Sequence, residues 1–183
     1  LIILSSVCLL FILLIFLYQR RMLFPIHYAP QVPETPRTPP NTTRLWIESE
    51  TARVEAWFIL GRDVTPETPG PVVVFTHGNA EVIDVAAPML TPYLRAGVSI
   101  ALLEYRGYGR SSGGPSEDGL IADGLALVEQ LRGRPEVDAD RIILHGRSLG
   151  GGVTCGIAES FVPRAIILES TFTSVSDLAW DMW

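Results

Sequence analysis

The stretch Arg141-Ile142-Ile143-Leu144-His145-Gly146-Arg147-Ser148-Leu149-Gly150 decides the fold of this chain. Its apolar, β-branched first half predicts a buried strand, and the small residues that follow predict a helix. Between them Ser148 has a glycine two positions away on each side, which is typical of a nucleophile elbow. Side chains at Gly146 and Gly150 would collide across such a sharp turn. The pattern therefore predicts that Ser148 is the nucleophile of an acyl transfer.

The serine motif alone is weak evidence, and an earlier loop in the sequence strengthens the interpretation. A serine between two such glycines arises by chance in roughly one chain of this length in twenty, as an ordinary turn before a helix. The run Pro71-Val72-Val73-Val74-Phe75-Thr76 predicts another buried strand, and it leads into His77-Gly78-Asn79-Ala80. Gly78 permits a tight turn after which the Asn79 N–H can face a developing oxyanion. The Leu149 N–H, at a helix N-terminus, would be the second donor.

Three motifs in this order resemble the α/β-hydrolase superfamily: His77-Gly78-Asn79-Ala80, Glu104-Tyr105-Arg106-Gly107-Tyr108-Gly109-Arg110-Ser111, and Gly146-Arg147-Ser148-Leu149-Gly150-Gly151. Residues 44–180 look most like the membrane-anchored members related to the yeast bud-emergence factor. Glu169-Ser170-Thr171-Phe172 is similar to the same branch. That family usually has aspartate where this chain has Glu104, and we interpret Glu104 as a carboxylate that stabilises a turn. The resemblance implies a serine hydrolase.

Strand-like and helix-like segments alternate through the rest of the chain. This alternation predicts an α/β fold with a doubly wound, mostly parallel sheet, here an incomplete α/β-hydrolase fold. Two half-exposed antiparallel strands should open it. The expected strands are residues 44–49, 53–60, 71–76, 98–103, 141–145 and 165–168, and the expected helices are residues 82–96, a helix capped by Ser116, and the helix after Ser148.

The N-terminus is almost entirely apolar through Tyr18 and ends at Gln19-Arg20-Arg21. Eighteen helical residues span about 27 Å, close to the thickness of a hydrocarbon core. A cleaved signal peptide is the competing interpretation, but the apolar run is long and no Ala-x-Ala-like site follows it. We therefore expect an N-terminal transmembrane helix that contacts membrane lipid in a single pass. Arg20 and Arg21 are too few to settle which side holds the catalytic domain.

The domain organisation follows from these segments. Residues 1–19 are expected to be the membrane anchor, and residues 20–43 a proline-rich, extended linker. Residues 44–183 are expected to be the N-terminal part of an α/β-hydrolase domain. Net charge is −6, without a basic cluster, which argues against nucleic acid as a partner. Cys8 and Cys155 are not expected to pair, and Cys155 should be a small buried helix residue.

The base that a catalytic serine needs is missing from the expected place. In this fold the acid and then the histidine follow the serine, yet His27, His77 and His145 all precede Ser148. Two downstream carboxylates, Asp177 and Asp181, come before the strand whose loop normally holds the acid, and are better interpreted as surface or cap residues. We therefore expect the acid and histidine about one hundred residues further along, little hydrolysis by this chain alone, and an exposed apolar edge at residues 165–168.

The favoured function is hydrolysis of acyl esters or thioesters, lipid-derived acyl groups among them, with no cofactor and no metal. Ser148 would attack the acyl carbonyl while the Asn79 and Leu149 N–H groups hold the oxyanion. Two alternatives stay open: a non-catalytic binding or scaffold protein of the same fold, and a serine peptidase. Dehalogenase and epoxide hydrolase chemistry on this fold uses an aspartate nucleophile, so serine at position 148 argues against both. The sequence does not indicate an oligomeric state.

Overall fold

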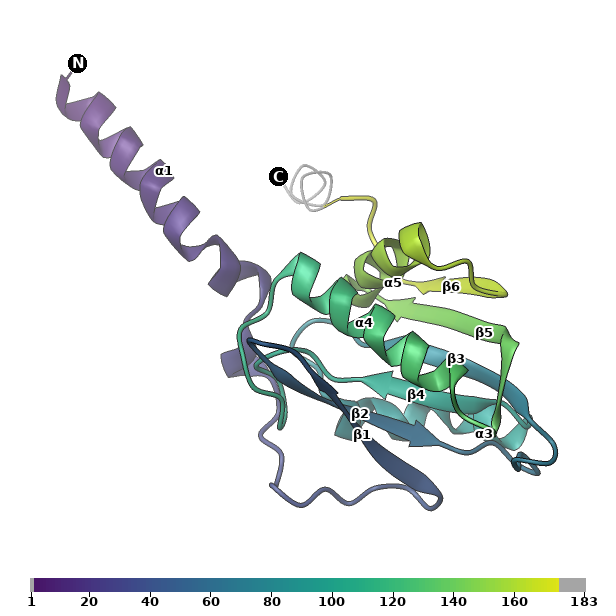
Figure 1. The fold of residues 1–183 in the computed structure, drawn as a ribbon. Coiled ribbons are helices and arrows are strands. Elements are labelled where there is room, and N and C mark those ends of the chain that lie inside the picture. The colour runs from purple at the N-terminus through teal and green to yellow at the C-terminus, as the bar shows by residue number, and fades with distance from the viewer. Residues whose placement is uncertain (1, 175–183) are drawn as a thin grey trace.

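A six-stranded sheet organises the chain in the computed structural model, which describes residues 2–174 (Figure 1). Its order is β1-β2-β4-β3-β5-β6, with β1, β2 and β4 paired antiparallel and β4, β3, β5 and β6 paired parallel. The predicted mostly parallel, doubly wound sheet is confirmed. The strands are β1 (Thr42–Glu48), β2 (Arg53–Ile59), β3 (Gly70–Thr76), β4 (Ser99–Leu103), β5 (Val137–Arg147) and β6 (Ala165–Glu169).

Helices cover both faces of the sheet, and each face has its own core. The helices α4 (Glu117–Arg132) and α5 (Leu149–Ser160) lie over one face. The short elements α2 (Ile83–Ala86), η2 (Ala87–Leu90) and α3 (Thr91–Arg95) lie over the other. Alternation along β3 supplies both cores, since Val72 and Val74 join the first and Val73 and Phe75 the second. A parallel sheet buried in this way needs runs of apolar residues on its central strands.

Three local predictions are corrected. The expected helix over residues 82–96 is broken into α2, η2 and α3, because Pro88 and Pro92 each lie in the first turn of a new helical segment. The strand predicted as half-exposed over residues 53–60 is buried along nearly all of β2, because β1 and β4 flank it and both of its faces are covered. Cys155 is exposed on α5 rather than buried. Ser116 does cap α4, where its Oγ accepts from the Gly119 N–H.

The N-terminal helix α1 (Ile2–Leu23) stands apart from the sheet (Figure 1). It is apolar and long enough to cross a membrane, and it runs four residues past the expected end of the anchor. The following segment is not wholly extended, since residues Ile26–Tyr28 form a 3₁₀ turn, η1. Phe24, Ile26 and Ala29 are half-buried against the core under α4 and α5. The proline-rich stretch is therefore docked on the domain over its first residues.

The last described strand, β6, has β5 as its neighbour within residues 2–174. All five of its residues are exposed, including the apolar side chains of Ile166, Ile167 and Leu168. This agrees with the apolar edge expected at residues 165–168. Asp177 and Asp181 lie outside the described residues.

Candidate active site

Ser148 forms the sharp turn between β5 and α5. Its backbone has φ 51° and ψ −117°, a conformation that residues with a Cβ rarely adopt. Neighbouring groups hold it there. The Ser148 N–H donates to the Glu169 carbonyl at 2.9 Å, and the Ser148 carbonyl accepts from the Gly151 N–H and the Thr171 hydroxyl. The turn between β5 and α5 therefore has the strained geometry that a nucleophile elbow requires.

The two glycines of the motif are required by close packing. A Cβ on Gly146 would lie 2.6 Å from both the Gly150 carbonyl carbon and the Thr154 Oγ1. A Cβ on Gly150 would lie 2.6 Å from the Thr76 carbonyl carbon and 2.8 Å from the His77 carbonyl oxygen. The first turn of α5 thus packs directly on the end of β3, where the predicted oxyanion loop starts.

The register of the sheet brings the two predicted oxyanion donors to the same edge. Thr76 is paired with Gly146 across β3 and β5, so the chain leaves both strands side by side. Asn79 follows β3 by three residues, and Leu149 is the first residue of α5. Within residues 2–174 neither backbone N–H has an acceptor. The roles of Ser148, Asn79 and Leu149 nevertheless remain predictions.

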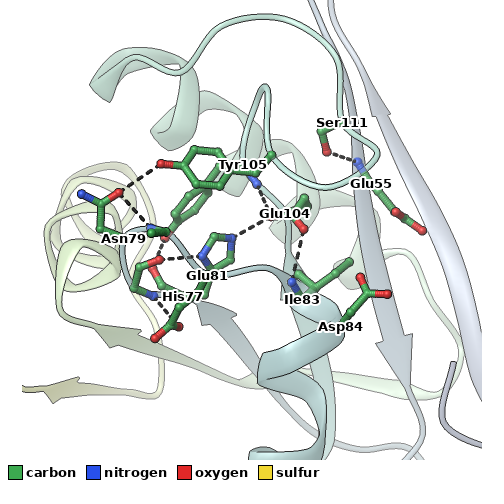
Figure 2. A network of polar contacts seen from close by, with 12 residues as sticks. Glu55, His77, Asn79, Glu81, Ile83, Asp84, Glu104, Tyr105 and Ser111 are labelled. Carbon is green, nitrogen blue, oxygen red and sulfur yellow. Dashed lines mark hydrogen bonds and ion pairs between the residues drawn. The ribbon is translucent and has the colours of Figure 1, made fainter. Parts of the chain in front are cut away.

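A buried contact between His77 and Glu104 holds the loop that starts at His77 (Figure 2). His77 Nε2 lies 2.8 Å from Glu104 Oε1, and both side chains are fully buried. His77 Nδ1 bonds to the Gly78 carbonyl, while Glu104 also accepts from the Ile83 and Tyr105 N–H groups. Glu104 therefore connects the loop at His77, the start of α2 and the end of β4, which agrees with its interpretation as a turn-stabilising carboxylate. With both nitrogens engaged, His77 is a structural residue.

Two tyrosines complete the support of this loop. The Tyr105 hydroxyl donates to the His77 carbonyl at 2.7 Å, and the Tyr108 hydroxyl donates to Asn79 Oδ1 at 3.0 Å. Burial raises the pKa of Tyr105 well above its usual value and raises the pKa of Tyr108 to about 12. Both phenols therefore keep their protons at physiological pH and act as donors.

An ion pair joins the loop after β3, which holds the predicted oxyanion donor, to the turn at Ser148. Glu81 accepts from the Gly78 N–H at 3.0 Å and pairs with Arg147, the residue before Ser148. Both partners are partly shielded from solvent, which strengthens the attraction over that of an exposed pair. Sequence reasoning missed this pair, because 66 residues separate the two side chains and only the docking of α5 brings them together.

A charged cluster fixes α2 against the first strands. Glu55 is fully buried on β2 and pairs with Arg44 and Arg110 at 2.7 and 2.5 Å. Arg110 also forms a two-point contact with Asp84 on α2, next to the Ile83 N–H that Glu104 binds. Ser111 Oγ accepts from the Glu55 N–H (Figure 2). The motif that follows β4 thus connects β2 to α2, the helix after the predicted oxyanion loop.

No histidine among residues 2–174 contacts Ser148. The His145 side chain points to the face of the sheet that α2, η2 and α3 cover. There its ring packs edge-on against Phe75, and its Nδ1 lies 3.2 Å from the Tyr93 hydroxyl. Its Nε2 is 3.3 Å from Glu169 Oε2 without the geometry of a hydrogen bond. Burial lowers the pKa of His145 despite the nearby carboxylate of Glu169. His27 lies exposed on η1, beside Tyr28.

Comparison with known proteins agrees with this architecture. A family model described as "Serine aminopeptidase, S33" matches residues 67–180. The α/β-hydrolase domain-containing protein WAV2 of Arabidopsis thaliana is 35% identical over 83% of this chain and 52% of its own length. Protein bem46 of Schizosaccharomyces pombe is 28% identical over 88% of this chain and 56% of its own. The chain therefore spans about half the length of these curated relatives.

Solved structures give the same result. The crystal structure of an α/β hydrolase from Vibrio vulnificus superposes with a TM-score of 0.61 and 26% identity, over 74% of this chain and 47% of that one. The mostly parallel sheet, the strained turn at Ser148, the structural likeness and the sequence matches agree on one assignment. The chain belongs to the α/β-hydrolase superfamily and, within it, to the bem46-like proteins.

Proposed function

We propose that the protein is a serine hydrolase of acyl esters or thioesters, with Ser148 as its nucleophile. The backbone of Ser148 carries this proposal. Ser148 is a non-glycine residue at φ 51°, and it lies between two glycines whose positions leave no room for a side chain. Strain of this kind is concentrated at functional sites, which supports a catalytic role. The Asn79 and Leu149 N–H groups, which have no acceptor among residues 2–174, would supply the complementary site for negative charge at the same edge.

The reaction would proceed in two steps. Ser148 Oγ bonds to the acyl carbon while a base takes its proton, and the oxyanion accepts from Asn79 and Leu149. The alcohol or thiol leaves with that proton as its bond to the acyl carbon breaks. Water then releases the acid and restores the serine. We propose that the base and its carboxylate partner lie in a part of the full protein outside this chain, which spans about half the length of its curated relatives.

A fluorophosphonate probe tests the nucleophile, because it forms a covalent bond only with an activated serine. We expect the full-length protein to be labelled, Ser148→Ala to lose the label, and Ser160→Ala to keep it, since Ser160 is exposed at the far end of α5. A folded full-length protein that resists the probe would instead favour a binding or scaffold role.

A peptidase is the second candidate, because the matching family model carries the description of a serine aminopeptidase. The same nucleophile and oxyanion donors would serve both reactions. Aminoacyl p-nitroanilides and p-nitrophenyl esters separate the two. We expect the esters to be turned over faster by the Ser148-dependent activity, and faster cleavage of the anilides would assign the protein to the peptidases instead.

A further inference from the structure

The end of α1 is bonded to the loop that holds the predicted oxyanion donor. The Leu23 carbonyl, at the last residue of α1, accepts from Asn79 Nδ2 at 2.8 Å. The same amide accepts from the Tyr108 hydroxyl through its Oδ1. One side chain therefore joins the N-terminal helix to the loops that follow β3 and β4. Both loops lie at the carboxyl edge of the sheet, where Ser148 lies.

The residues after α1 strengthen this attachment. Phe24, Ile26 and Ala29 pack on the core, and Ile26 Cδ1 lies 3.0 Å from the position of a Cβ on Gly107. Further along, the Pro33 carbonyl accepts from Arg110 at 3.2 Å. The segment between helix and domain is thus held in place, so α1 cannot swing to another side of the molecule without breaking these contacts.

No other segment among residues 2–174 packs over the side chains of α1. Its side chains from Ser5 to Met22 are exposed, and nearly all of those before Gln19 are apolar. Its 22 residues span about 33 Å, and Arg20 and Arg21 stand in its last turn. An apolar surface of this length, with a basic end, matches the hydrocarbon core and headgroups of a bilayer.

We propose that the carboxyl edge of the sheet faces the membrane and that Ser148 draws its acyl substrate from lipids resident in the bilayer. The proposal rests on the function proposed for Ser148. In Figure 1, α1 leaves the domain at the edge where β4 and β5 end and points away from it. A bilayer around α1 therefore lies next to the elbow, and an acyl chain has a short path to the nucleophile.

Fluorescence quenching tests the orientation independently of catalysis. The full-length protein, with Cys8 and Cys155 changed to serine, carries a bimane label at Glu117→Cys or at Arg132→Cys. Both positions are exposed at the two ends of α4, about 22 Å apart, and Glu117 lies at the carboxyl edge. In phosphatidylcholine vesicles with spin-labelled lipid, we expect several-fold stronger quenching at position 117. Equal quenching, stronger quenching at position 132, or cleavage that removes α1 would overturn the proposal.

Substrate presentation tests the path to the nucleophile. Ile26→Asp should release the segment after α1, whereas Tyr28→Asp alters a side chain that is exposed and serves as the control. We expect Ile26→Asp to lower turnover of a long-chain acyl ester held in vesicles about tenfold, because the effective concentration at the site falls. Turnover of a short, water-soluble ester should stay unchanged. A parallel loss with both esters, or no loss with either, contradicts bilayer delivery.

These measurements separate the two proposals. If the wild-type protein shows no Ser148-dependent labelling or turnover, the proposed hydrolase function fails while the quenching result still reports the orientation. If labelling succeeds but the two ends of α4 are quenched equally, the hydrolase function stands and the membrane-facing site is wrong.

Discussion

Replacing Gly150 by alanine should force α5 away from β3. The new Cβ would lie 2.6 Å from the Thr76 carbonyl carbon and closer still to the Thr76 carbonyl oxygen, and ordinary contact begins at 3.4 Å, so the two backbones must separate by more than about 0.8 Å. Neither can move easily. Thr76 is paired on both sides, with Leu103 of β4 and Gly146 of β5, and protein interiors are too densely packed to absorb the shift.

The expected change in the free energy of unfolding is the sum of two opposing contributions. Overpacking a core costs about 1–3 kcal/mol, and contact with backbone rather than with a flexible side chain places Gly150→Ala at the upper end. Alanine regains about 1 kcal/mol in helix propensity. We therefore expect a net loss of about 2 kcal/mol in the free energy of unfolding. Because the shift displaces the loop that carries Asn79, ester turnover should fall as much as about 100-fold.

Gly152→Ala is the matched control on the same helix. A Cβ there meets no atom within 4 Å, so only the gain in helix propensity remains, up to about 1 kcal/mol of stabilisation. Urea unfolding of the full-length protein in detergent micelles measures both variants, with the fluorescence of buried Trp57 as one probe. The packing argument is refuted if Gly150→Ala is as stable as the parent protein, or if both variants shift alike.

Three further predictions concern the groups around the site. Glu104→Ala should lose about 1–3 kcal/mol of stability in urea unfolding, because the buried groups that it binds lose their hydrogen-bond partner. Glu104→Asp keeps a carboxylate and should lose less than half of that, and equal losses would contradict this argument. Glu81→Ala removes the acceptor of the Gly78 N–H and the partner of Arg147, and it should lower ester turnover about tenfold with little change in melting temperature. A large drop in melting temperature alongside the loss of turnover would indicate a purely structural role. Burial holds the pKa of His145 below its unfolded value, so the unfolded state takes up the proton first and stability should fall as the pH drops below about 6.5. His145→Gln should therefore reduce the dependence of the melting temperature on pH between pH 7 and pH 5. An unchanged dependence would show that another group titrates.

The strands were predictable because their signal is local. Runs such as Val72-Val73-Val74-Phe75 can be buried on both faces, and their neighbours in sequence already show it. The elbow was equally accessible, since the glycines around Ser148 answer a steric demand within five residues of chain. The broken helix over residues 82–96 was within reach too, because Pro88 and Pro92 stand in the sequence and outweigh the apolar spacing.

The support of the site could not be predicted, because it arises from docking between distant segments. Glu81 and Arg147 meet only when α5 packs on the end of β3. Asn79 reaches back 56 residues to the Leu23 carbonyl, and no periodicity in either segment indicates that contact. The linker was expected to be extended because of its prolines, yet Phe24 and Ile26 find apolar partners on the domain. Composition describes the flexibility of such a segment and misses the surface it binds.

The backbone at position 148 also predicts which residue related sequences should keep there. At φ 51° and ψ −117°, glycine would be more stable than serine by about 1–3 kcal/mol. A lineage under pressure for folding alone would drift towards that residue, since the exchange needs only the loss of a small side chain. Persistence of serine there in living descendants would thus record continued use of its hydroxyl. Conversely, copies of this gene that have abandoned chemistry should be the ones in which position 148 relaxes to glycine.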